Sequence, residues 1–142
     1  MSVPLKVSRI KELHDIYHPI RLVCDESHIG APIITEMRLR GIGATPQKFS
    51  SVERNKLLSN MKPIIDGGLL VIPMNREDTK AIRLGALLTD QLMGFKEERS
   101  KLSNNKLLKS TALHDDIAMA LAMAINAGIK QKSLGCMIAS SQ

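Results

Sequence analysis

The apolar positions of the first fifty residues follow two spacings. From 5 to 17 they recur every three to four residues, which predicts a helix with one buried face built on Ile10, Leu13, Ile16 and Tyr17. The run IRLVC at 20–24 is short and mostly apolar, which predicts a strand buried on both faces. A helix from Gly30 to about Gly41 and a short strand at 42–46 are expected next. Helices that alternate with strands are typical of an α/β protein.

The rest of the chain continues this alternation. Helical spacing predicts helices at about 50–66 and 78–95, and the run LLVIP at 69–73 between them predicts a third strand. Residues 97–110 have no clear period, and we expect a mobile basic loop there. An Ala- and Met-rich helix is expected from about 110 to 127, packed on the sheet and ended by Gly128. The prediction is therefore three mostly parallel strands alternating with helices, with one domain over 1–128 and a flexible tail over 129–142.

Length and composition limit the classes of protein. A chain of 142 residues fits one compact domain and is too short for two full-sized catalytic modules. Cys24 and Cys136 have no CxxC spacing, so neither a zinc cluster nor a disulfide framework is indicated, and a reducing, cytoplasmic setting is expected. The longest apolar runs are shorter than a membrane span, and the charged N-terminus does not resemble a signal peptide.

Charge favours a polyanionic partner. The formal net charge is +6, and aromatic residues make up only 2%, so contacts to nucleic acid are expected to go through phosphates rather than base stacking. The stronger candidates precede the Ala-rich helix in the sequence: Arg99, Lys101, Lys106 and Lys109. The four basic residues between 48 and 62, Lys56 among them, are typical of a solvated helix face and are weaker candidates.

Acidic residues mark the candidate chemistry. His114, Asp115 and Asp116 stand at the start of an otherwise almost uncharged helix, and Asp25 follows the strand at 20–24. Carboxylates at a helix start also complement the helix dipole, and a lone His there is often a capping or surface residue, so a purely structural role is the alternative. If Asp25 and Asp116, 91 positions apart, meet at the carboxyl edge of the sheet, a cation is needed between them. Magnesium and manganese prefer such oxygen ligands, and two such ions can hydrolyse a phosphodiester.

The order of these segments resembles a known family. IRLVCDESHIGAPIITEMR, a strand, FSSVERNKLLSNMKPIIDGGLLVIP, a helix and HDDIAMALAMA occur in the order found in the C-terminal nuclease domain of the large subunit of viral DNA-packaging terminases. The resemblance covers about residues 5–127 and implies an RNase H-like fold. It also implies a metal-dependent endonuclease that uses Mg²⁺ or Mn²⁺ at a two-metal site to cut double-stranded DNA during genome packaging. Such a protein is virus- or provirus-encoded and acts in the host cytoplasm.

The resemblance also implies roles for single residues. Asp25 corresponds to the catalytic, metal-binding acid at the strand end, and the HDD helix supplies a further metal ligand, for which we favour Asp116 over Asp115. His114 is implied to help shape the site. Family members often have another Asp one turn after the HDD pair, where this chain has Met119.

A second departure concerns the start of the domain. The family's domain begins with a β-meander whose first strand supplies an essential Asp, and this chain starts at the following helix. We therefore expect an incomplete RNase H-like sheet, in which the strand at 20–24 is an edge completed by an upstream polypeptide, such as one with the terminase ATPase domain, or by self-association. Whether the chain is an active enzyme stays open. The alternatives are a non-catalytic module that binds DNA or packaging partners, and another RNase H-like nuclease such as a resolvase or transposase.

Overall fold

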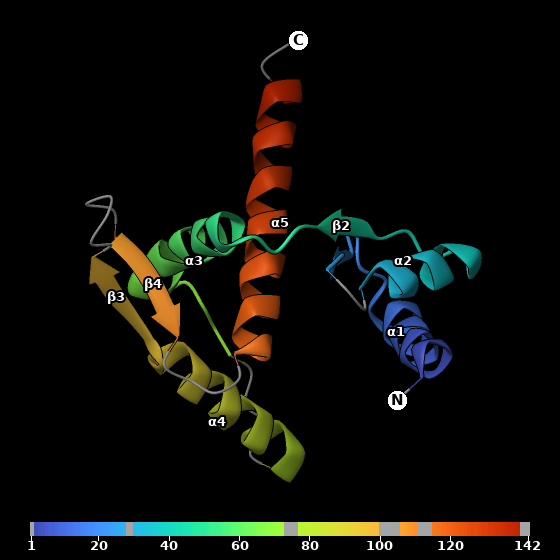
Figure 1. The fold of residues 1–142 in the computed structure, drawn as a ribbon, viewed down its shortest axis with the longest axis horizontal. Coiled ribbons are helices and arrows are strands. Elements are labelled where there is room, and N and C mark those ends of the chain that lie inside the picture. Colours follow the sequence, from blue (N-terminus) through green and yellow to red (C-terminus); the bar gives the residue numbers. More distant parts are fainter. Residues whose placement is uncertain (1, 28–29, 73–76, 100–105, 111–114, 140–142) are drawn as a thin grey trace. The chain divides into compact units, whose positions relative to one another are not determined.

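The structure is a computed structural model that describes residues 2–27, 30–72, 77–99, 106–110 and 115–139 (Figure 1). The chain divides into two compact units, unit 1 (Met1–Glu53) and unit 2 (Arg54–Gln142). Each unit is described by itself below.

Unit 1 is a helix followed by a strand, a helix and a parallel strand. Its elements are α1 (Val3–Tyr17), β1 (Val23–Asp25), α2 (Gly30–Leu39) and β2 (Thr45–Gln47). β1 and β2 are parallel and joined by α2, with Val23 opposite Thr45 and Asp25 opposite Gln47. Both strands overlap their predicted ranges, 20–24 and 42–46, but begin three residues later and end one residue later. In the described part of the chain this sheet has two strands, so β1 has β2 as its hydrogen-bonded neighbour on one edge.

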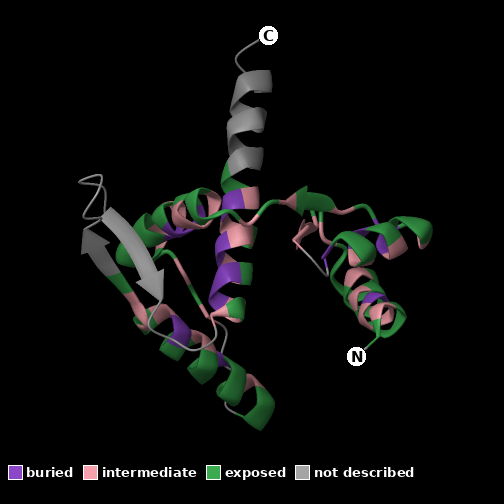
Figure 2. Ribbon diagram, viewed as in Figure 1, coloured by how far each residue is buried: buried purple, intermediate pink, exposed green. Residues whose placement is uncertain are grey.

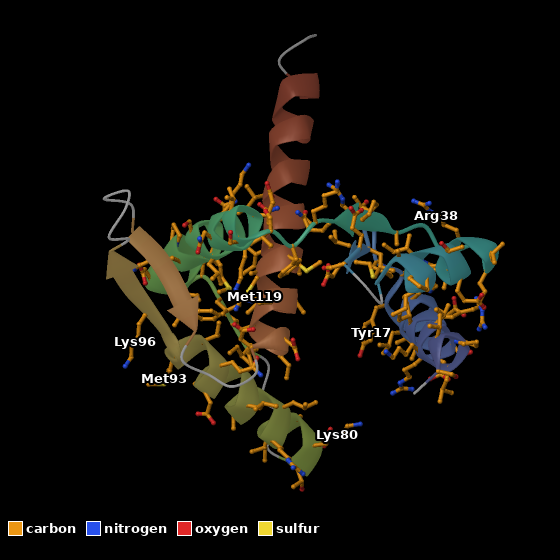
Figure 3. All side chains as sticks on the ribbon, in the orientation of Figure 1. Tyr17, Arg38, Lys80, Met93, Lys96 and Met119 are labelled. Atoms are coloured by element: carbon orange, nitrogen blue, oxygen red, sulfur yellow. The ribbon has the colours of Figure 1, made fainter. Side chains whose placement is uncertain are left out.

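The core of unit 1 joins α1, α2 and the chain after α2. Val7, Met37 and Ile42 are at most 2% exposed, and the half-buried residues packed around them are Val3, Ile10, Leu22, Ile33 and Ala44. The predicted buried face of α1 is therefore wrong in part. Leu13, Ile16 and Tyr17 are exposed, because the face that meets α2 is the one carrying Val3, Val7 and Ile10. Figure 2 shows that α1 has both exposed and less exposed parts, and Figure 3 labels Tyr17.

Unit 2 contains most of α3 (Ser51–Asp66), then α4 (Thr79–Met93), β3 (Phe95–Arg99), β4 (Lys106–Ser110) and α5 (Asp116–Ala139). Two predicted helix starts are confirmed by their caps. The Ser50 hydroxyl oxygen accepts the Glu53 N–H at 3.2 Å, and one Asp78 carboxylate oxygen accepts the N–H groups of Lys80 and Ala81 at 2.8 and 3.3 Å. The Asp78 cap fixes where α4 begins.

The core of unit 2 forms between helices. Leu57, Leu58 and Met61 of α3 are at most 3% exposed, and so are Ala118 and Ala122 of α5. The side chains of Asn60 in α3 and Asn126 in α5 share a hydrogen bond of 2.8 Å, and Asn126 is 7% exposed. Small alanines let the helices approach closely, and the Asn pair satisfies the polar groups buried with them. The packing of α5 on the parallel sheet, expected from the sequence, stays a prediction.

Residues 97–99 and 106–110 form strands where the sequence predicted a loop over 97–110, and the residues between them lie outside the described residues. β3 and β4 pair as an antiparallel ladder in which Phe95 lies opposite Ser110 and Arg99 opposite Lys106. The prediction failed because this hairpin is held by backbone hydrogen bonds between strands of mostly charged and polar sequence, which have no apolar period to detect.

Two other element predictions are corrected. Residues 69–72 of the run at 69–73 form no strand; Leu69 and Val71 are 71% and 82% exposed, and an apolar run without a pairing partner does not make a ladder. The last helix begins at Asp116 rather than near 110 and continues to Ala139 rather than ending at Gly128. Gly128 does not have the positive φ of a helix-ending glycine. The domain boundary predicted at residue 128 stays a prediction.

The predicted α/β class is confirmed by the parallel β1–α2–β2 unit and the surrounding helices. Within the described residues, no helix is long and apolar enough to cross a membrane.

Candidate active site

Asp25 lies at the carboxyl end of a parallel strand, as the sequence predicts. It is the last residue of β1, opposite Gln47 of β2, and the Glu26 N–H donates to the Gln47 carbonyl oxygen at 3.1 Å. The residue is half-buried. The carboxyl ends of parallel strands form the edge at which open α/β sheets bind ligands, so Asp25 is well placed to contact one.

The turn after β1 fixes the Asp25 carboxylate. Its Oδ1 accepts hydrogen bonds from the Ser27 backbone N–H, at 2.8 Å, and from the Ser27 hydroxyl. Among the described residues, no hydrogen-bond donor contacts Oδ2. One oxygen therefore anchors the side chain, and the other is available to a cation or a water molecule.

Gly30 brings the start of α2 against the same residue. A Cβ added at Gly30 would lie 1.6 Å from the Asp25 carbonyl oxygen, so only glycine allows this approach. Gly30 is buried, and its N–H donates to the Ser27 carbonyl oxygen at 2.8 Å. Asp25, Ser27 and Gly30 are thus held to one another by these contacts.

The Cys24 thiol lies next to the Asp25 carboxylate in the sequence, and its pKa depends in part on that charge. Burial raises the pKa of the Cys24 thiol, and the negative charge of Asp25 raises it further. Both causes favour the neutral thiol, which makes Cys24 a poor nucleophile and a poor metal ligand at neutral pH. Cys24 is half-buried, so it is best described as a small side chain that packs rather than reacts.

Asp115 and Asp116 stand together at the start of α5 but have different surroundings. Asp116 is the first helical residue and is exposed. The side chain of Asp115 is 14% exposed and forms an ion pair with the guanidinium of Arg54 from α3. Among the described residues, Asp116 has no ion-pair partner. Of the two carboxylates, Asp116 is therefore the more accessible.

Gln91 of α4 caps the start of α5. Its side-chain oxygen accepts the backbone N–H groups of Ile117, at 3.1 Å, and of Ala118, at 3.0 Å, while the residue is 5% exposed. Sequence reasoning missed Gln91, and it considered Arg54 only as one of the weaker candidates for DNA contact, not as a partner of Asp115. A polar residue on the apolar side of the 78–95 helix was the one available signal for Gln91, and no spacing rule links Arg54 to a residue 61 positions away.

The remaining candidates are described in part. His114 and Lys101 lie outside the described residues. Arg99 lies on β3, and Lys106 and Lys109 lie on β4, where only the backbone is described. Lys56 is exposed on α3, as expected for a solvated helix face. Met119 is 4% exposed on α5 (Figure 3), so the position where the family often has an acid is part of the core here.

The acids have the donor chemistry of a site for a hard divalent cation. Carboxylate oxygens are the ligands that such ions prefer, and Asp25 presents one free oxygen on a fixed side chain. Asp25 belongs to unit 1, and Asp115 and Asp116 belong to unit 2. Within the part of the chain that is described, no group of three or more His, Cys, Asp or Glu side chains converges on one point.

An open pocket in unit 2 does not contain these acids. It lies among α3, α4 and β3 and is lined mainly by apolar side chains, with the Lys62–Asp66 ion pair beside them. A pocket of this composition does not supply the carboxylates that a divalent cation needs.

Comparison with known proteins identifies relatives of this chain. No family model matches it. The large terminase subunits of Thermus phage G20c and Thermus virus P23-45 are each 30% identical to it over 121 residues, which is 84% of this chain. The chain spans 23% of the length of these relatives.

Solved structures show the same relationship at the level of the fold. The crystal structure of the large terminase nuclease from the thermophilic phage G20c matches with a TM-score of 0.66 and 28% identity over 89% of this chain and 62% of that one. Its forms with bound magnesium and bound cobalt match with TM-scores of 0.68 and 0.67 at the same identity and coverage.

The fold is therefore the α/β, RNase H-like fold of a terminase nuclease domain, as the sequence resemblance implied. The chain is a homologue of the terminase large subunit, and the match to the G20c structure is to the nuclease part of that subunit.

Proposed function

We propose that this chain is a metal-dependent endonuclease domain that cuts double-stranded DNA during viral genome packaging. The observation that carries the proposal is Asp25, a carboxylate at the end of a parallel strand with one oxygen fixed by Ser27 and the other available. The G20c terminase nuclease, which this chain matches over 89% of its length, has been crystallised with bound magnesium and with bound cobalt. A relative that binds divalent metals supports the same chemistry here.

The metal ligands in this proposal are Asp25 and Asp116, with Asp115 beside them. Bound Mg²⁺ or Mn²⁺, as two ions, would supply an activated water and stabilise the charge that develops on the leaving oxygen. The Ser27 hydrogen bonds keep the Asp25 carboxylate in one orientation, so its other oxygen would be available to hold a bound cation. The exposure of Asp116 favours it over Asp115 as the second ligand. His114 precedes this pair in the sequence and is proposed to shape the site.

Contacts to the DNA backbone are proposed for the basic residues. A net charge of +6 favours association with phosphates, and few aromatic residues are present to stack on bases. The hairpin strands β3 and β4 carry three of the candidate cations and the chain between them a fourth; the set is Arg99, Lys101, Lys106 and Lys109. Lys56 on α3 is a further candidate.

The partners follow from the same reasoning. In the described part of the chain, β1 pairs with β2 along one edge, and its other edge has no strand partner. A further strand could pair with this free edge, which lies on the strand that ends in Asp25. We propose that an upstream polypeptide, such as one carrying the terminase ATPase domain, or a second copy of this chain supplies it. The site of action would be the cytoplasm of the infected host cell.

Plasmid cleavage tests the proposal. Supercoiled DNA is incubated with Mn²⁺ and the chain, its Asp25→Asn variant or its Asp116→Asn variant, with EDTA as the metal-free control. Nicking or linearisation by the parent chain, lost in both variants and in EDTA, supports the nuclease. Cutting that persists in both variants contradicts the proposed site.

A second candidate function is a non-catalytic module that binds DNA or packaging partners. The lack of a converging group of three acidic or other metal-binding side chains among the described residues favours it. Retention of DNA binding by the parent chain and by both variants, with no cutting under any condition, would support the module over the nuclease. Among enzymes, a resolvase or transposase would instead prefer branched or specific DNA in the same assay.

A further inference from the structure

The pairing of Arg54 with Asp115 bears on how the acidic helix binds a metal. The guanidinium comes from α3, within unit 2, and contacts the carboxylate immediately before the first residue of α5. The Asp115 side chain is 14% exposed, so this pair is only partly screened by water. A fixed positive charge therefore already neutralises one of the two adjacent acids.

Such a charge acts on a divalent cation in two ways. It repels the cation, and it occupies an Asp115 oxygen that the cation would otherwise use. Both effects weaken metal binding, and both leave Asp116, which has no ion-pair partner among the described residues, as the accessible ligand.

The start of α5 does not depend on Arg54 alone for its position. The buried Gln91 side chain accepts the N–H groups of Ile117 and Ala118, and the Asn60–Asn126 hydrogen bond links α5 to α3 further along. Removing the guanidinium should therefore change the charge at the acids while the helix start stays in place.

We propose that Arg54 is a positioning residue. It keeps the Asp115 carboxylate in an ion pair, leaves Asp116 as the acid that binds the divalent cation, and lowers the affinity of the site for metal. The inference rests on the metal site of the proposed function and adds to it a residue that determines which acid binds.

Calorimetric titration with Mn²⁺ tests this role on the full chain at about 0.1 M monovalent salt, where charges more than about 10 Å apart are largely screened. Arg54→Gln removes the charge, and we expect it to bind Mn²⁺ more tightly, on the order of tenfold. Arg54→Lys keeps the charge and should stay close to the parent chain. Lys62→Gln is the matched control: it removes a positive charge that is paired with Asp66 and lies about 12 Å further along the same helix, so screening by salt should leave the affinity nearly unchanged. Circular dichroism of each variant verifies the fold.

Unchanged or weaker Mn²⁺ binding by a folded Arg54→Gln variant would overturn the inference, as would an equal gain in Lys62→Gln. If Arg54→Gln does not fold, Asp115→Asn provides the test. Mn²⁺ binding that is retained in this variant supports the proposal that Asp115 pairs with Arg54 and does not bind the metal, and loss of Mn²⁺ binding contradicts it. Failure of the proposed function has a different signature, because the parent chain itself would then bind no Mn²⁺, which would remove this role with it.

Discussion

Gly30 and Asp25 form the tightest contact around the candidate site. A Cβ at residue 30 would lie 1.6 Å from the Asp25 carbonyl oxygen, so Gly30→Ala must displace the start of α2 or the end of β1. We expect a loss of at least about 2 kcal/mol in the free energy of unfolding, because backbone on both sides has to move. Urea denaturation measures it.

Gly43→Ala is the matched control. The added Cβ meets no atom within 4 Å and the residue has no positive φ, so the change should stay within about 0.5 kcal/mol of zero. Equal stabilities for the two variants would contradict the close approach at Gly30.

The pKa of the Cys24 thiol depends in part on the negative charge of Asp25. The pKa of the Cys24 thiol is raised in the folded state. The contribution of this thiol to the free energy of unfolding is therefore fully present below the ordinary thiol pKa and is lost as pH rises through the raised pKa. Asp25→Asn removes one of the two causes and leaves burial, so alkylation of Cys24 should begin at lower pH in that variant.

Alkylation by iodoacetamide, followed residue by residue with mass spectrometry between about pH 7 and pH 10, gives the two profiles. Superimposable profiles for the parent and Asp25→Asn chains would show that the carboxylate does not act on the thiol.

Single residues differed in how far the sequence could predict them. Asp25 was predictable because an acid after a short apolar run falls at a strand end, and the edge of a parallel sheet is where ligands bind. The Arg54–Asp115 pair was not, since an ion pair between residues 61 positions apart depends on how α3 and α5 pack. The proposal that Asp116 rather than Asp115 binds the metal has a physical reason only in the structure, where Asp115 is paired with Arg54 and Asp116 is exposed.

At the scale of elements, the cap of α5 is the contact most open to test. Gln91→Ala leaves the N–H groups of Ile117 and Ala118 without their acceptor in a buried setting, and we expect it to cost about 1–3 kcal/mol of unfolding free energy. Gln91→Glu keeps the acceptor oxygen but buries a negative charge near Asp115 and Asp116, so it is also expected to lower the free energy of unfolding.

Thermal and urea unfolding of both variants provide the comparison. If Gln91→Ala is as stable as the parent chain, water replaces the cap and Gln91 does not hold the acidic helix.

Helices were predicted better than strands for a physical reason. The apolar residues at helical spacing in 50–66 and 78–95 predicted α3 and α4 correctly. A helix forms its backbone hydrogen bonds within itself, so the sequence has to supply only an apolar face and a capping residue such as Asp78. A strand needs a partner that its own residues do not specify. The apolar run at 69–72 has no ladder, while the charged segment Phe95–Arg99 has one.

At the scale of the whole molecule, the account depends on two acids from distant parts of the chain. The fold class, the order of the five helices in the described residues and the β1–α2–β2 unit followed from local patterns, and the relationship to terminase nucleases agrees with them. The proposal that Asp25 and Asp116 act in one site concerns a long-range property that no local pattern encodes. It requires that one cation bind both carboxylates.

Titration of the full chain with Mn²⁺ is the most direct test of that requirement. We compare the parent chain with Asp25→Asn, with Asp116→Asn and with the double variant. A shared cation predicts that each single substitution abolishes the same binding event and that the double variant is no worse than either, because ligands of one site are not additive. Full binding by either single variant, or losses that add as for independent sites, would contradict the account.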